Sequence, residues 1–195
     1  MSKPFKNLRK YYESKYKKHS FSLYYKKNDA YKIYLVQHTL HVIKKLTEFT
    51  KLTILDIGCA DGFFADYFAK LKGFTIGVDI NKIEVLRAKN KSKRCSFCLG
   101  DAQNLSFKKD SFDVVFCKDV LEHIPNDKTC CEEIFRVLKT GGYAIISVPT
   151  RDTTSISAFF TKLAKFFGFF EKFRVSTSLE DIFTGQLRLE HIHTY

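Results

Sequence analysis

The sequence predicts an α/β protein built on a doubly wound parallel sheet with helices on both faces. From Leu52 onward, short apolar runs alternate with segments whose apolar residues recur at helical spacing. This alternation is typical of parallel strands joined by crossover helices. The clearest change of pattern follows the apolar run TILDI, where Gly58 and Gly62 interrupt the chain before a second apolar run begins. We therefore expect a strand, a glycine turn and a helix at this point.

The other elements follow in order along the chain. Strands are predicted at 52–57, 74–79, 95–100, 112–118 and 143–149. The first helix runs from the glycine turn to a stop at Gly73, and Asn81 caps the second helix. Asn126 begins the third helix, which is expected to close on Gly141 and Gly142.

The chain divides into three predicted regions around one core. Residues 1–51 are expected to form a basic, Tyr-rich helical segment, 52–150 the α/β core, and 151–195 a Phe-rich amphipathic region with an incomplete C-terminus. No stretch approaches the roughly 18 apolar residues of a membrane span. The first residues lack the apolar core and cleavage site of a secretory signal, so the chain is predicted to be cytoplasmic.

Cysteine usage fits that compartment. The six cysteines are scattered through predicted strands and helices, which argues against a disulfide framework. Cys95 and Cys98 have metal-ligand spacing, but a zinc site would need a second such pair or nearby histidines. A buried strand is the favoured interpretation, and no metal is predicted.

The positive charge belongs to the N-terminal segment. Of the net charge of +12, residues 1–51 contribute 13 Lys and Arg against 3 acids, and the remaining residues 20 against 18. Basic residues interleaved with tyrosines are one way to hold single-stranded nucleic acid. An amphipathic helix with its lysines in water explains the same residues and is favoured, because a charge run is usually a solvated face.

The glycine turn limits the ligands that the first strand could serve. A nucleoside triphosphate would need a lysine directly after Gly62, where the chain has Phe63. A dinucleotide would need the motif Gly-x-Gly-x-x-Gly, but its third position is Ala60 and there is no Gly at 63. Its pyrophosphate would also face Asp56 and Asp61. The turn is acidic, so we expect a ligand that carries positive charge.

S-adenosylmethionine meets this requirement with its ammonium and sulfonium groups. The glycines let the backbone approach the amino-acid end of the ligand. Asp56, at the tip of the strand, can attract the ammonium of that end through water or peptide groups. Asp79 ends the second strand, where it can accept hydrogen bonds from both ribose hydroxyls. Asp101 follows the third strand and can accept from the adenine amino group.

Five motifs carry a family resemblance. LDIGCADG, GVDI, GDAQNLSF, SFDVVFCKDVLEHIPN and RVLKTGGYAIISVP resemble, in order and spacing, the motifs of class I S-adenosylmethionine-dependent methyltransferases, over about residues 50–150. The nearest group is the broad methyltransferase type 11 group that includes quinone-biosynthesis enzymes. The resemblance implies a Rossmann-like fold and a transferase that methylates a small-molecule or lipid-like acceptor.

The resemblance also implies roles for individual residues. Contacts to the methionine moiety would come from Asp56, Gly58, Cys59 and Gly62, with Lys118 near the same end; Asp79 would bind the ribose, Ile80 the adenine face, and Asp101 with Ala102 the adenine edge. The chain departs from the family at Ala60, where Gly is more frequent, and at Thr140, where Pro is usual. A methyl group at Ala60 is tolerable if φ is negative.

Methyl transfer is an in-line displacement, for which the protein mainly supplies alignment and a dry pocket. A general base helps only when the acceptor is a hydroxyl or a carbon acid. His123 in the motif LEHIP is the candidate base and Glu122 a weaker one. A structural role for His123, hydrogen-bonded to backbone at a helix start, remains the alternative.

The C-terminal region bears on the acceptor. Residues 156–173 place a stripe of apolar, mainly Phe, side chains on one helical arc, which could be core, a lid over an apolar acceptor, or a surface resting on a membrane. The family normally adds antiparallel strands after the fifth strand, and these are apparently missing. The chain could be truncated, another subunit could cover the open edge in an oligomer, or the protein could be a damaged relative that binds the cofactor weakly.

Two further functions stay open beside the small-molecule methyltransferase. An RNA methyltransferase would use the basic segment at 1–51, although the residues after the fourth strand, KDVLEH, lack the Asn-Pro-Pro-Tyr type of motif that clamps a base. A non-catalytic protein would keep only the cofactor-binding fold.

Overall fold

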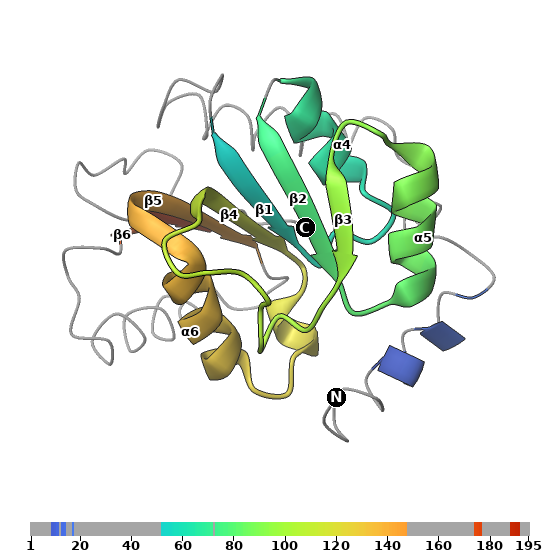
Figure 1. The fold of residues 1–195 in the computed structure, drawn as a ribbon. Helices are drawn as coiled ribbons and strands as arrows, with labels where there is room; N and C mark the ends of the chain where they lie inside the picture. Colours follow the sequence, from blue (N-terminus) through green and yellow to red (C-terminus); the bar gives the residue numbers. More distant parts are fainter. Residues whose placement is uncertain are drawn as a thin grey trace. The chain divides into compact units, whose positions relative to one another are not determined.

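The computed structural model describes residues 9–11, 13–14, 17, 52–71, 73–147, 174–176 and 188–191 (Figure 1). The predictions for most of 1–51 and for 148–173, including the Phe-rich stripe, lie outside these residues. The chain forms two compact units, residues 1–101 and 102–195. No helix among the described residues is long and apolar enough to cross a membrane.

The described residues of the first unit include three parallel strands and two helices of eight and ten residues. Its strands are β1 (Thr53–Ile57), β2 (Phe74–Asp79) and β3 (Ser96–Leu99), and its helices are α4 (Phe63–Lys70) and α5 (Lys82–Lys91). β2 lies between β1 and β3 and pairs in parallel with both. Each of these elements lies where the alternation of apolar runs and helical patterns predicted it.

Side chains between α4, α5 and the strands form a small core. Cys59, Ala65, Val85, Ala88 and Phe97 are buried together there. The Asn81 side chain accepts a hydrogen bond from the N–H of Ile83 at 3.0 Å, which confirms the predicted cap of α5. The cap residue follows the last residue of β2 by two positions, so the connection is short and the end of β2 is held close to the helix.

The described residues of the second unit include four strands and two helices. These are β4 (Phe112–Lys118), the 3₁₀ helix η3 (Leu121–His123), α6 (Asp127–Val137), β5 (Leu138–Ser147), β6 (Arg174–Ser176) and β7 (Arg188–His191). β4 and β5 pair in parallel. The strand order is β3-β2-β1-β4-β5-β7-β6, and its first five strands form the predicted doubly wound parallel sheet.

The transition from α6 to β5 differs from the prediction. The Asn126 side chain caps α6 as expected, accepting from the N–H of Thr129, but the helix ends at Val137 and β5 begins at once with Leu138. The segment that precedes Tyr143 is therefore part of an irregular strand rather than the end of a helix. In the pairing of β4 with β5, Phe112 lies opposite Leu138 and Val114 lies opposite Tyr143, so the register shifts across Gly141 and Gly142. These glycines therefore lie in an irregular stretch of β5 and do not close the helix.

The far edge of the sheet carries two short strands that were not predicted. The sequence predicted that the antiparallel edge strands were missing, and here β7 pairs with β5 and β6 pairs with β7, all in parallel. The strands among the described residues therefore include no antiparallel one, but the sheet does continue. Segments as short as RVS and RLEH carry too few residues to display an alternating pattern, which is why the sequence did not reveal them.

Candidate functional site

The turn after β1 is wound by three residues in the left-handed region. Gly58, Ala60 and Gly62 have φ values of 71°, 45° and 80°. The N–H groups of Gly58 and Cys59 both donate to the carbonyl of Val78, at 2.8 and 3.1 Å, which fastens the turn to β2. The condition set for Ala60 is not met, because its φ is positive. An alanine there carries a backbone strain that glycine would not.

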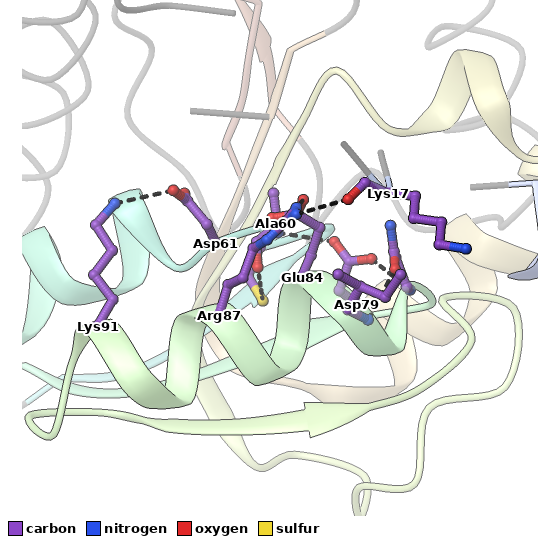
Figure 2. A network of polar contacts seen from close by, with 10 residues as sticks. Lys17, Ala60, Asp61, Asp79, Glu84, Arg87 and Lys91 are labelled. Carbon is purple, nitrogen blue, oxygen red and sulfur yellow. Dashed lines mark hydrogen bonds and ion pairs between the residues drawn. The ribbon is translucent and has the colours of Figure 1, made fainter. Parts of the chain in front are cut away.

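Asp79 ties the turn to the start of α5. One of its carboxylate oxygens accepts from the N–H of Ala60 at 2.8 Å, and the other accepts from the N–H of Asn81 at 2.7 Å (Figure 2). Burial raises the pKa of Asp79, while hydrogen bonds from Asn81, Ala60 and Ile80 lower it. These three N–H donors occupy most of the roughly four lone-pair sites of the carboxylate, so it is held in a fixed position and keeps acceptor capacity for a further donor.

Asp56, in β1, is the most deeply buried acid of this turn. Only 3% of the residue is exposed, and its Oδ2 atom has no hydrogen-bond partner. Burial raises the pKa of Asp56 well above its usual value, Asp79 raises it further, and the N–H of Ala65 lowers it. A buried carboxylate oxygen without a partner is costly, and a ligand that brings a cation or a donor would remove that cost.

Asp61 plays a different part from the one predicted. Its carboxylate forms an ion pair at 3.0 Å with Lys91 at the C-terminal end of α5 (Figure 2). The neighbouring lysine offsets the charge of Asp61, so the negative charge available at the turn belongs chiefly to Asp56 and Asp79. Lys91 lies 30 residues later in the chain, so the local sequence of the turn could not predict this ion pair.

Glu84 is a buried acid that the sequence reasoning missed. It is 2% exposed, its Oε1 atom pairs with Arg87, and its Oε2 atom has no partner. Burial raises its pKa, which Arg87 lowers and Asp61 and Asp79 raise again. Arg87 also donates to the carbonyl of Lys17 at 3.3 Å (Figure 2). The spacing of Asn81 and Glu84 was the available signal, since it is the spacing of a capping box.

Two glycines near the turn are required by packing. A Cβ atom on Gly62 would lie 2.5 Å from the Phe97 ring, and one on Gly77 would lie 2.8 Å from the Cys59 sulfur. Burial raises the pKa of Cys59 well above its usual value, with Asp79 and Asp56 adding to the rise. Cys59 is therefore a neutral thiol at the base of the turn, and the predicted ligand role of Gly62 is accompanied by a structural one.

The predicted adenine residues follow β2 and β3 directly. Ile80 is the first residue after β2, and the N–H of Gly100 donates to the main-chain carbonyl of Asp79 at 2.9 Å. Asp101 comes next and is half-buried. Ala102, which opens the second unit, is also half-buried. Within the first unit, the structure thus brings together Asp56, Gly58, Cys59, Gly62, Asp79 and Ile80, with Asp101 one residue beyond the Gly100 contact.

The end of β4 carries the charged residues of the second unit. Lys118 has a side chain only 7% exposed and forms an ion pair with Asp119, whose φ of 53° is unusual for a residue other than glycine. Burial raises the pKa of Glu122, Asp119 raises it further, and Lys118 lowers it. The His123 side chain is nearly half exposed, with its Nε2 atom 3.7 Å from Glu122. Its main-chain N–H donates to the carbonyl of Val120.

Cys95 and Cys98 have separate contacts. The Cys95 sulfur lies 3.6 Å from the Ser92 hydroxyl, and the Cys98 sulfur lies 3.7 Å from the carbonyl of Gly77. Burial raises the pKa of both thiols. Within the described part of the chain, no group of three or more His, Cys, Asp or Glu side chains could hold a metal ion.

Comparison with known protein families shows which family this chain belongs to. A family described as a methyltransferase domain matches residues 48–175, which is more than half of the chain. The chain belongs to this family. The match begins before β1 and ends at β6, so it includes the turn, the ends of β2 and β3, and the segment Lys118–His123.

Curated relatives carry the same assignment. The chain is 36% identical over 131 residues to a demethylmenaquinone methyltransferase of Lactococcus lactis, an alignment that covers 62% of this chain and 52% of the relative. It is 37% identical over 112 residues to sterol 4-C-methyltransferase strm-1 of Caenorhabditis elegans, covering 54% and 34%. The chain thus spans about half or less of the length of these relatives.

A solved structure supports the fold. The YcgJ protein of Bacillus subtilis is similar, with a TM-score of 0.52 and 26% identity over 67% of this chain and 56% of that protein. Together with the strand order β3-β2-β1-β4-β5, this likeness identifies a Rossmann-like methyltransferase fold.

Proposed function

We propose that this protein binds S-adenosylmethionine at the turn after β1 and directs its methyl group to an apolar small-molecule or lipid-like acceptor. The observation that carries the proposal is the buried Asp56, whose Oδ2 atom lacks a partner. The ligand needed there is cationic, because a phosphate or pyrophosphate would add to the negative charge of Asp56 and Asp79.

The residues of the turn suit the two ends of such a donor. Asp56 would attract the ammonium of the methionine moiety, and the backbone of Gly58 and Cys59 would lie against that end. Asp79 would accept from the ribose hydroxyls, since its oxygens are held by Ala60 and Asn81 and keep free lone pairs. Ile80 would cover the adenine face, and Asp101 with Ala102 would meet the adenine edge.

The donor, when bound, supplies an activated methyl group, and the protein contributes position and the exclusion of water. Correct orientation of two reactants can provide roughly 7 to 11 kcal/mol of the barrier reduction, so no single side chain need be essential. In the second unit, Lys118 would lie toward the methionine end. His123 and Glu122 are the proposed proton acceptors for a hydroxyl or carbon-acid acceptor.

The acceptor class is proposed from the relatives. Two of them are named for demethylmenaquinone and sterol methylation, and both kinds of acceptor are largely apolar. An acceptor of this type would need a dry pocket more than a charged one. The basic residues at 1–51 keep an RNA acceptor as the competing proposal.

Calorimetric titration tests the donor proposal. Wild-type protein is titrated with S-adenosylmethionine, ATP and NAD, and Asp79→Ala is titrated with S-adenosylmethionine. We expect binding of S-adenosylmethionine alone, and its loss in the variant. Binding of ATP or NAD in place of S-adenosylmethionine would overturn the proposal.

A methyl-transfer assay tests the acceptor class. Protein with radiolabelled donor is offered a demethylated quinol, a sterol and a mixed RNA pool, and product is counted in the organic and aqueous phases. Label in the organic phase supports an apolar acceptor. Label in the RNA, together with RNA binding that collapses as salt rises, would favour the competing proposal.

A further inference from the structure

A Glu–Arg pair on α6 holds the segment that leads into β4. Arg136 bonds both carboxylate oxygens of Glu133, with Nε to Oε1 at 2.6 Å and a terminal nitrogen to Oε2 at 2.8 Å. The paired geometry raises the pKa of Arg136 and lowers that of Glu133. Both groups are therefore charged at neutral pH, and the fork is rigid.

This pair grips main-chain atoms rather than other side chains. Arg136 donates to the carbonyls of Leu105 and Phe107, at 2.8 and 2.7 Å. Glu133 accepts from the N–H of Leu105 at 2.6 Å. Both main-chain polar groups of Leu105 are thus bound by α6, and we name Glu133 and Arg136 the α6 clamp.

Further contacts continue the attachment toward β4. The N–H of Asp110 donates to the carbonyl of Arg136 at 3.0 Å, and the N–H of Ser111 donates to the carbonyl of Val137 at 2.8 Å. The Leu105 side chain is buried. The rings of Phe107 and Phe112 meet edge to face, with centroids 5.1 Å apart. The segment 105–111 is therefore fixed along its length, and the α6 clamp holds the end nearest to Ala102.

The held segment begins three residues after Ala102, the residue proposed for the adenine edge. Only Gln103 and Asn104 lie between Ala102 and Leu105. Because both the N–H and the carbonyl of Leu105 are bound, the positions that Ala102 can take are limited. Hydrogen bonds to a base edge depend on sub-ångström placement of the main chain. A loop held at one end by a rigid ion pair is suited to that task.

We propose that Glu133 and Arg136 are positioning residues that set the discrimination between adenine and other bases in the donor. The inference rests on the proposed function, because it needs the donor to bind with its adenine at Asp101 and Ala102. The α6 clamp does not touch the base itself. It acts by holding the chain that does, and therefore affects recognition of the adenine edge more than recognition of the methionine end.

The experiment compares S-adenosylhomocysteine with S-inosylhomocysteine, which carries hypoxanthine and differs only at the base. A site built to accept from the adenine amino group should prefer the first by about a hundredfold or more. We expect Arg136→Ala to reduce this preference about tenfold, because misplaced hydrogen bonds to the base edge lose most of their value. Affinity is measured by calorimetry, and the ratio of the two dissociation constants is the readout.

Two further variants separate positioning from general stability. Glu133→Gln keeps an oxygen that can accept from Leu105, so its preference should lie between those of wild type and Arg136→Ala. Lys139→Ala removes a nearby ion pair, in which Lys139 lies 2.9 and 3.0 Å from the Asp113 carboxylate, and should leave the ratio unchanged. Should Arg136→Ala fail to fold, Arg136→Lys, which keeps the charge but loses the fork, takes its place.

The outcomes are distinct. A reduced ratio in the clamp variants with an unchanged ratio in Lys139→Ala supports the proposal. Equal weakening of both ligands, with the ratio preserved, overturns it while leaving the proposed function intact. A wild-type protein that binds neither ligand overturns both.

Discussion

Two loops of this protein are each fixed by a carboxylate that accepts hydrogen bonds from main-chain N–H groups. The two carboxylates differ in that only the second is paired with an arginine. At the turn after β1, Asp79 accepts from the N–H groups of Ala60 and Asn81, and burial raises its pKa. Before β4, Glu133 holds Leu105 with Arg136 fully engaged beside it, and its pKa is lowered.

The difference teaches how to tell a binding loop from a scaffold. The segment before β4 has its charges matched within the protein, so it needs no ligand. The turn after β1 lies against the buried Asp56, which leaves an oxygen without a partner, and the half-buried Asp79. An acid with no matched cation raises the free energy of the unliganded protein, and a cationic ligand can recover it.

The largest expected effect is on donor affinity in Asp79→Ala. The variant removes the proposed acceptor for the ribose and the anchor of the turn, so S-adenosylhomocysteine should bind about a hundredfold or more weakly. Calorimetry provides the measurement. Asp66→Ala is the matched control, because Asp66 pairs with Lys70 on the surface of α4, and its affinity should match wild type. Equal affinities in the two variants would remove Asp79 from the site.

Arg136→Ala tests the scaffold side of the comparison. The change leaves Glu133 without its cation and frees the carbonyls of Leu105 and Phe107, which should lower the free energy of unfolding by about 3 kcal/mol. Urea denaturation measures it. Lys139→Ala, which breaks a partly exposed pair, should cost about 0.5 kcal/mol or less. Similar losses in both variants would mean that the α6 clamp is an ordinary surface ion pair.

Ala60→Gly sharpens the account of the turn. Ala60 has a φ of 45°, where a side chain is disfavoured, so glycine should raise the free energy of unfolding by about 1 kcal/mol. Ala69→Gly, a change in the last turn of α4, should lower it by up to about 1 kcal/mol, because glycine disfavours the helical conformation. Thermal and urea unfolding give the two signs. A loss in both variants would show that the turn stores no strain at Ala60.

The pH dependence of stability should have opposite signs in the two loops. The folded-state pKa of Asp56 is raised, so the folded protein binds more protons and its stability falls as pH rises from about 4, the unfolded value. The pKa of Glu133 is lowered, so its contribution is present above its unfolded value and is lost as pH falls through its folded pKa.

Variants isolate these contributions. The stability advantage of Asp56→Asn over wild type should grow with rising pH, whereas the deficit of Glu133→Gln should shrink as the pH is lowered. Urea unfolding between pH 4 and pH 8 gives both profiles. Parallel profiles for the two variants would contradict the contrast between the loops.

The sequence predicted β1 to β5 and the caps Asn81 and Asn126, because those depend on local patterns. It also predicted the acidic residues at the strand ends. It could not predict that Lys91 would neutralise Asp61, since that contact joins residues 30 apart in the chain. The left-handed Ala60 was likewise hidden, because its conformation is imposed by Asp79 and the turn rather than by alanine itself.

The second unit shows the same limit. The sequence singled out Lys118 and His123 by motif, but the pairing of Lys118 with Asp119 and the exposure of His123 come from the fold. The role of Arg136 depends on the carbonyls of Leu105 and Phe107, about 30 residues earlier in the chain, which no local pattern reveals. The predicted roles of Lys118 in donor binding and of His123 in catalysis stay predictions.

Thermal unfolding of wild type and Asp56→Asn, with and without S-adenosylmethionine, tests the central claim most directly. At neutral pH, the unliganded variant should be more stable than wild type by about 1 kcal/mol, because a buried charge is removed while the bond from Ala65 can be kept. S-adenosylmethionine should stabilise wild type strongly and the variant little. A variant that is less stable without ligand, yet gains as much from S-adenosylmethionine as wild type does, would contradict the account.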